Sequence, residues 1–144
     1  MAYEPYWEIQ GSLARSSRPG YSSEDVPREE VDDWLRKVKA LGVKSIICLL
    51  TEEQIGFYPQ VPGRLLSYYR QQGLKVEHIG ITDPARDPER GGAELQRSLP
   101  EIYEAFKRLP KPVLVHCSAG QDRTGKAVAY IKARLAQAGE DEVG

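Results

Sequence analysis

The chain is poor in the residues that bind metals or form disulfides. Its 144 residues include two cysteines, Cys48 and Cys117, and two histidines, His78 and His116. Two cysteines do not make a disulfide framework, and without a CxxC pair a closed zinc site cannot be assembled convincingly. We therefore expect neither a metal nor another cofactor.

Long hydrophobic runs are also missing. The longest strongly apolar stretch is SIICLL, far shorter than the roughly 20 residues that a membrane-spanning helix needs. The first residues, MAYEPYWEIQ, lack the basic and apolar regions of a signal peptide. The expectation is a soluble, cytoplasmic protein with no membrane span.

Neither sign of charge is in excess. Lys and Arg number 20, and Asp and Glu number 21, so the formal net charge is -1 at pH 7. Such a balance gives no overall attraction to nucleic acid or to a membrane surface, and any anion must be recognised locally. The length suits one compact domain, and residues 1–144 are interpreted as such, with no indication of the oligomeric state.

What the chain does have is an alternation of apolar runs with amphipathic stretches. The apolar runs predict strands around 7–14 and at 44–50, 75–81 and 112–116. Helical spacing predicts helices between Asp25 and Gly42 and at 65–72, 95–109 and 124–137, and the Pro- and Gly-rich stretch 83–92 predicts a loop. This alternation predicts an α/β fold with a mostly parallel central sheet, flanked by helices on both faces, that binds ligands at the carboxyl ends of its strands.

The segment HCSAGQDRTG at 116–125 follows the last predicted strand and leads into the last predicted helix. Backbone N–H groups at a helix start have no partner within the helix, and together with the helix dipole they form an anion site. Gly120 allows the backbone to approach a bound group, and Gly125 allows the helix to pack tightly as it begins. Arg123 adds a planar fork of donors that suits two oxygens of one phosphate.

Cys117 begins this loop, so its sulfur is expected in the same anion site. A helix N-terminus and a nearby guanidinium stabilise a thiolate, which is then a nucleophile aimed at phosphorus. The plain alternative is a structural cysteine in a turn, but the six fixed positions of H-C-x-x-G-x-x-R-T-G would arise by chance in about one such chain in a million. Cys48, in the predicted strand 44–50, is interpreted as a core residue, with a backup thiol for Cys117 as the alternative.

HCSAGQDRTG resembles the signature loop of the protein tyrosine phosphatase superfamily, and a weaker similarity extends from about Trp7 to Leu135. The small size and the order of strands and helices resemble the compact dual-specificity branch. The resemblance implies a phosphoric monoester hydrolase in which Cys117 attacks phosphorus and becomes a phosphocysteine. It also implies that Thr124 offers its hydroxyl to the sulfur and that His116 supports the loop. The phosphoryl oxygens would be bound by the loop N–H groups and the guanidinium of Ser118, Ala119, Gly120, Gln121, Asp122 and Arg123.

Expulsion of a phenolate or an alkoxide needs a general acid, which this family usually supplies from a loop upstream of the cysteine. The run HIGITD resembles the family's pattern of an acid after a short apolar run, which favours Asp83. Asp87 fits the separation from Cys117 nearly as well. Asp122 lies in the loop itself, as in some lipid phosphatases, and its plainer role is an ion pair with Arg123 or with a neighbouring basic residue. All three aspartates remain open, with Asp83 preferred.

The variable positions of the loop, Ser118, Ala119 and Gln121, are neutral, whereas lipid and inositol phosphatases of this superfamily tend to carry lysines there. The sequence therefore favours a phosphorylated protein or peptide as the partner, chiefly phosphotyrosine with tolerance for phosphoserine and phosphothreonine. A phosphoinositide or inositol phosphate is the alternative substrate. The alternatives from other classes are a non-catalytic phospho-residue binding module and a rhodanese-like sulfurtransferase. The scattered basic residues that could ring the cleft are interpreted as solvated surface, namely Arg18, Arg86, Arg90 and Lys126.

Overall fold

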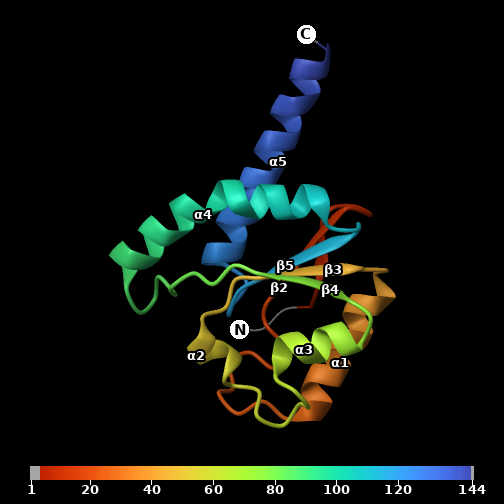
Figure 1. Cartoon of the computed structure of the whole chain (residues 1–144), viewed down its shortest axis with the longest axis vertical. Coiled ribbons are helices and arrows are strands. Elements are labelled where there is room, and N and C mark those ends of the chain that lie inside the picture. The colour runs from red at the N-terminus through yellow and green to blue at the C-terminus, as the bar shows by residue number, and fades with distance from the viewer. Residues whose placement is uncertain (1–3, 144) are drawn as a thin grey trace.

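The computed structural model describes residues 4–143, which form a five-stranded sheet between two layers of helices (Figure 1). The strand order is β1-β2-β5-β3-β4. β1 pairs antiparallel with β2, and the other neighbours pair in parallel. The strands are β1 Tyr6–Ile9, β2 Leu13–Ser16, β3 Ser45–Cys48, β4 Lys75–His78 and β5 Val113–His116. The predicted α/β architecture with a mostly parallel sheet is confirmed.

The helices divide between the two faces of the sheet (Figure 1). They are α1 Arg28–Ala40, α2 Glu52–Ile55, α3 Leu65–Gln71, α4 Pro88–Arg108 and α5 Asp122–Val143. α4 and α5 share a core with Ile47 and Val115, and α1 and α3 share another with Ile46 and Leu114. Because successive side chains of a strand point to opposite faces, the fully buried strands β3 and β5 contribute to both cores. In the part of the chain that the structure describes, no helix is long and apolar enough to cross a membrane.

The expectation of a single strand around 7–14 is wrong, because this segment is a hairpin of β1 and β2. Trp7 lies opposite Ala14, and residues 10–12 form the turn. Gly11 in that turn has a φ of 76°, in the left-handed region that glycine adopts without strain. The apolar pattern runs through the turn and hides it. The second strand then pairs with β5 and places the chain that follows it beside the signature loop.

The loop predicted at 83–92 is shorter than expected, because α4 already begins at Pro88. Asp87 caps this helix, its Oδ1 accepting a hydrogen bond from the Arg90 backbone N–H at 3.0 Å, and proline is favoured in a first helical turn. Gly91 is needed for packing, since a Cβ there would lie 2.7 Å from the carbonyl oxygen of Thr82. The segment that carries Asp83 is therefore held close to the start of α4.

Candidate active site

The signature loop lies at the carboxyl edge of the parallel strands, as predicted. Its first carbonyl, that of His116, accepts a hydrogen bond from Leu49 N–H beyond β3 at 2.9 Å. The carbonyl of Ser118 accepts one from Arg18 N–H beyond β2, also at 2.9 Å. A pocket of about 350 Å³ opens at this edge and is lined by Tyr21, Asp83, Ala85, Cys117, Ser118, Ala119, Gln121, Asp122 and Arg123. The structure thus brings Asp83 together with the cysteine and the arginine of the loop.

Three loop residues have the local structure that the motif requires. Cys117 is a free thiol that lines the pocket and is only 2% exposed. Gly120 has a φ of 77°, a conformation that side chains disfavour. Thr124 is fully buried, and its Oγ1 has no hydrogen-bond partner among the described residues. Buried hydroxyls normally find a partner, so an unpaired one is unusual.

Arg123 is buried, and one side of its guanidinium is fully engaged by the protein. Nη1 donates hydrogen bonds to the carbonyl oxygens of Leu49 and Ile81, at 3.2 and 2.8 Å, and to Gln54 Oε1 at 3.1 Å. Nη2 makes an ion pair with Asp83 Oδ2 at 3.2 Å. The anchored Nη1 fixes the guanidinium plane, and the Nη2 side is the one that reaches the acidic residue of the pocket.

The three candidate acids occupy different places. Asp83 lines the pocket, and its carboxylate has three partners. Oδ2 makes the ion pair with Arg123 Nη2 and accepts a hydrogen bond from Gln54 Nε2 at 3.1 Å, and Oδ1 accepts one from Ala85 N–H at 3.0 Å. Asp87 serves as the cap of α4. Asp122 lines the pocket from the first turn of α5, but the ion pair of Arg123 is made by Asp83.

His116 is completely buried behind the loop. Burial lowers the pKa of its imidazole from 6.5 to about 4, with the positive charges of Arg18 and Arg123 acting in the same direction. The ring is therefore neutral at pH 7. Since the Cys117 carbonyl can only accept, Nδ1–H donates to it at 3.0 Å, and Nε2 accepts from the Tyr69 hydroxyl at 2.9 Å. His116 thus supports the backbone at the cysteine.

Two arginines near the end of β2 donate hydrogen bonds to the signature loop. Arg15 Nη2 donates to the Gly120 carbonyl at 2.7 Å, and Arg18 Nε donates to Ser118 Oγ at 3.0 Å. Arg18 is 2% exposed, so the interpretation of this residue as solvated surface is wrong. Its guanidinium lies over the rings of aromatic neighbours, and this gives it a favourable place away from water. Sequence reasoning passed over Arg15, although its position at a predicted strand end was a usable signal.

Gln54 is a second residue that sequence reasoning missed. It lies in the single-turn helix α2, which the hydrophobic pattern does not reveal, and it contacts both Arg123 and Asp83. The usable signal was the run TEEQ, in which Thr51 and Gln54 have the spacing of a capping box. In the structure this capping box is formed.

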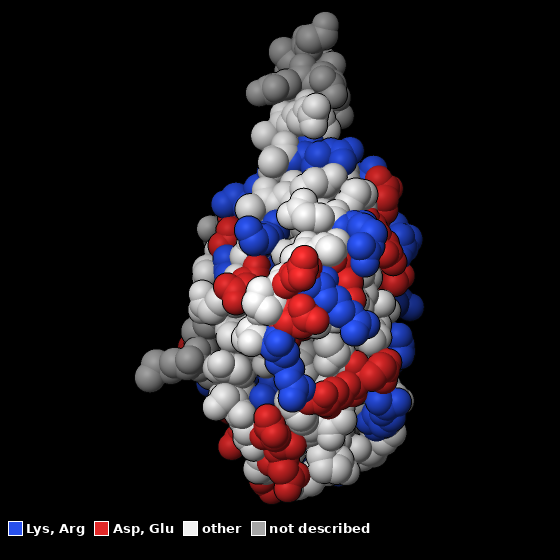
Figure 2. All heavy atoms as spheres, turned by 90° about the vertical axis from the view of Figure 1, so that its left-hand side faces the viewer, with Lys and Arg blue, Asp and Glu red and all other residues white. Residues whose placement is uncertain are grey.

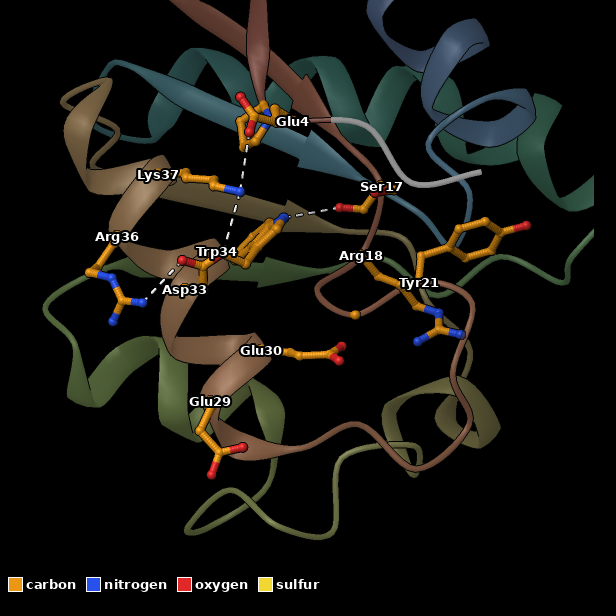
Figure 3. A pocket seen from close by; sticks show the side chains of 12 residues that line it. Glu4, Ser17, Arg18, Tyr21, Glu29, Glu30, Asp33, Trp34, Arg36 and Lys37 are labelled. Carbon is orange, nitrogen blue, oxygen red and sulfur yellow. Dashed lines mark hydrogen bonds and ion pairs between the residues drawn. The ribbon is translucent and has the colours of Figure 1, made fainter.

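A larger hollow of about 670 Å³ lies beside the active-site pocket (Figure 3). Tyr21 lines both, and Arg18, which holds Ser118, lines the hollow. Figure 3 shows Glu29 and Glu30 extending from α1, with the Glu30 carboxylate directed toward the segment that carries Arg18 and Tyr21. Lys37 is neutralised there by ion pairs, so the hollow is not a basic surface.

Neither a metal site nor a redox pair is evident in the described part of the chain. No group of three or more His, Cys, Asp or Glu side chains could hold a metal ion within residues 4–143. Cys48 is fully buried in the core, and burial raises the pKa of its thiol to about 12. It therefore remains a protonated core residue at neutral pH.

Two curated proteins with similar sequences are inositol diphosphatases. DSP2 of Oryza sativa subsp. japonica is 33% identical over 99 residues, which are 65% of this chain and 41% of that protein. SIW14 of Saccharomyces cerevisiae is 27% identical over 129 residues, which are 90% of this chain and 39% of that protein. The chain thus spans about 40% of the length of these relatives. They agree better with the inositol phosphate alternative than with the expected phosphotyrosine substrate.

A solved structure and a family model are also similar to this chain. A crystal structure of kinase associated phosphatase, with serine in place of its catalytic-site cysteine, superimposes with a TM-score of 0.60 and 25% identity. The match covers 85% of this chain and 65% of that one. The model of the tyrosine phosphatase family matches residues 31–143, well over half of the chain. From its signature loop, its fold and this match, the chain belongs to the tyrosine phosphatase family.

Proposed function

We propose that this protein is a cysteine-dependent phosphatase that removes the terminal phosphate of an inositol diphosphate. The observation that carries the proposal is the pocket of about 350 Å³ that Cys117, Arg123 and other residues of the signature loop line together with Asp83. The two inositol diphosphatase relatives support the choice of substrate. A helix N-terminus combined with a guanidinium is a site for phosphate whichever group the phosphate is attached to.

The reaction follows from these groups in two steps. The Cys117 thiolate attacks the terminal phosphorus, an S–P bond forms, and the P–O bond to the leaving group breaks with its electron pair on oxygen. Water then attacks the phosphocysteine, inorganic phosphate leaves, and the thiolate is restored, with the buried Thr124 hydroxyl available to the sulfur. Arg123 and the loop amides stabilise the charge on the equatorial oxygens in both steps.

The surroundings of Asp83 support a leaving group that is a weak base. All three contacts to its carboxylate come from donors, so both oxygens act as acceptors in this structure. Cleavage of a diphosphate expels a phosphate, which needs less help from a proton donor than a phenolate or an alkoxide. Asp83 remains the proposed acid for substrates that do need one, because it is the upstream aspartate that lines the pocket.

A phosphotyrosine peptide is the second candidate, and the charge around the site favours it. Figure 2 shows basic and acidic side chains intermingled on the face that carries α2 and the start of α4. Of the arginines that could ring the cleft, Arg86 is paired with Glu53 and Arg90 with Glu94. Together with the neutral loop positions, these pairs leave little free positive charge for a highly phosphorylated ring.

The experiment is a substrate panel with the purified protein. It compares an inositol diphosphate, an inositol monophosphate and a phosphotyrosine peptide at equal concentrations, with release of phosphate as the readout. We expect the diphosphate to give the highest kcat/KM. Cys117→Ser is the control and should abolish turnover of every substrate while retaining phosphate binding, because a serine hydroxyl is not ionised at neutral pH.

Two results would count against the proposal in different ways. A kcat/KM for the peptide above that for the diphosphate would replace the inositol substrate by the protein substrate and leave the chemistry intact. Residual activity of Cys117→Ser above roughly a tenth of wild type would remove the thiolate mechanism itself, since covalent catalysis then would not depend on sulfur.

A further inference from the structure

Gln54 is held in one conformation by the cap of α2. Its backbone N–H donates to Thr51 Oγ1 and its side-chain Oε1 accepts from Thr51 N–H, both at 3.2 Å. This reciprocal capping box turns the side chain back toward the start of the helix. The residue is 7% exposed, so little water competes for its amide.

The same amide connects the two charged residues of the pocket. Oε1 accepts from Arg123 Nη1 at 3.1 Å, and Nε2 donates to Asp83 Oδ2 at 3.1 Å. Arg123 Nη2 and Asp83 Oδ2 complete the ring at 3.2 Å. A carboxylate at position 54 could accept from the arginine but not donate to the aspartate, and an apolar side chain could do neither. A side-chain amide fits both partners, because it carries an acceptor and a donor.

We propose that Gln54 is a positioning residue of the reaction, which keeps Asp83 at the pocket. This role rests on the proposed thiolate chemistry with Asp83 as the acid. A phosphoryl group that binds Arg123 competes with Asp83 for Nη2. The hydrogen bond between Gln54 and Asp83 does not involve Nη2. This hydrogen bond therefore still holds the acid beside the leaving group when the phosphoryl group breaks the ion pair between Asp83 and Arg123.

Other groups near Asp83 do not duplicate this role. Arg86 is paired with Glu53 on the exposed side of α2, and Glu94 of α4 accepts from the Thr82 backbone N–H at 2.8 Å. Arg123 is the charged residue in ion-pair contact with the Asp83 carboxylate. A change at Gln54 is therefore expected to act on Asp83 directly.

The test uses aryl phosphates whose leaving groups differ in basicity. Gln54→Met preserves the length of the side chain and removes the amide contacts with Arg123, Asp83 and Thr51 N–H. We expect kcat for phenyl phosphate to fall roughly tenfold or more, and kcat for p-nitrophenyl phosphate to change by less than about threefold, because the weakly basic nitrophenolate needs little protonation. In an Asp83→Asn background the same substitution should add little, since residues that act as a unit are not additive.

Gln54→Glu gives a second, independent readout. It places a negative charge against the Asp83 carboxylate, and a like charge disfavours ionisation of its neighbour. The basic arm of the pH–rate profile for phenyl phosphate should therefore move to higher pH. A residue that merely stabilises α2 would not move this arm.

Thr51→Ala is the matched control. It removes the side-chain cap and loosens α2, but it leaves the amide of Gln54 its contacts with Arg123 and Asp83. It should affect the rates for both aryl phosphates equally, with the thermal midpoint of each variant reporting on folding.

Equal losses of rate on both substrates in Gln54→Met would overturn the positioning role even if Asp83→Asn discriminates between the substrates. If Asp83→Asn also slows the two aryl phosphates equally, the assignment of Asp83 as the acid and the positioning role of Gln54 both fail. The choice of an inositol diphosphate as substrate is tested separately by the substrate panel.

Discussion

At the scale of single residues, Arg123 divides its guanidinium between two tasks. Nη1 is anchored to two backbone carbonyls and to Gln54, and Nη2 faces Asp83 in the pocket. A lysine ammonium is a point charge that cannot hold the anchors and also bind two phosphoryl oxygens. We therefore expect Arg123→Lys to lower kcat/KM roughly 100-fold or more, the range seen when one transition-state donor is lost.

Steady-state kinetics of Arg123→Lys on the preferred substrate check this prediction. Arg86→Lys is the control, because Arg86 is exposed and paired with Glu53 outside the pocket, and it should keep near-normal rates. Near-normal rates in Arg123→Lys as well would mean that the arginine has a structural role only.

The buried imidazole of His116 leads to a prediction about stability rather than about rate. Its pKa is lowered from 6.5 to about 4 in the folded protein, chiefly by burial. Between these two values the unfolded chain binds the proton and the folded protein does not, so stability rises with pH across this window. The free energy of unfolding should thus fall by up to about 3 kcal/mol as the pH is lowered from 6.5 to 4, and the contribution is fully present above pH 6.5.

Urea unfolding at several pH values measures this dependence. In His116→Gln the group cannot titrate, so the slope between pH 6.5 and 4 should be flatter than in the wild type. An unchanged slope in His116→Gln would show that another group is responsible for the loss of stability in acid.

At the scale of elements, the junction between α4 and the loop before it controls where Asp83 lies. A Cβ on Gly91 would lie 2.7 Å from the Thr82 carbonyl oxygen and 3.0 Å from Pro84 N, so this loop would have to move. Gly92, the next residue in the same helix, has no atom within 4 Å of such a Cβ. The two glycines therefore form a matched pair in one helix.

We expect opposite results from alanine at these two positions. Gly91→Ala should lower both the melting temperature and kcat for phenyl phosphate, because backbone atoms on each side of Asp83 are displaced. Gly92→Ala should keep full activity and stabilise the protein by about 0.5–1 kcal/mol, since alanine is the better helix former. Thermal melts and steady-state kinetics on both variants test this prediction. Equal melting temperatures and equal kcat values in the two variants would contradict the close packing of Gly91 against Thr82 and Pro84.

At the scale of the whole molecule, the sheet brings distant segments to one edge. Arg15 and Arg18 come from β2 and the chain beyond it, Gln54 follows β3, and Cys117 follows β5. These strands are neighbours and run in parallel, so their carboxyl ends meet at the signature loop. The site is consequently built from groups that follow neighbouring strands of the sheet.

The thiolate chemistry of this assembled site predicts a characteristic response to small reagents. Activity should be unchanged by EDTA, because nucleophile, anion site and acid are all supplied by side chains and backbone. Vanadate should inhibit as a mimic of five-coordinate phosphorus, and peroxide should inactivate by oxidising the Cys117 thiolate. Activity that EDTA abolishes and added zinc or magnesium restores would contradict the proposed mechanism.

The amino-acid sequence by itself determined the α/β order and the signature loop. Both are local properties, since hydrophobic period reports on nearby residues and the loop is ten consecutive positions, 116–125. It also selected Asp83, whose role as the acid stays a prediction. Local composition gave two wrong predictions. The Pro and Gly residues at 88–92 indicated a loop, but they lie in the first turns of α4. The unbroken apolar pattern around 7–14 indicated one strand, but the chain turns at Gly11.

Only the tertiary structure decided which groups surround the reacting atoms. Arg123 contacts Leu49, Gln54, Ile81 and Asp83, which lie 40 to 74 positions before it in the chain. No periodicity of the sequence encodes such pairs. The burial of Arg18 behind Ser118, 100 positions away, likewise depends on β2 pairing with β5. A sequence pattern reports which residues can do chemistry, whereas the parallel pairing of strands decides which of them meet.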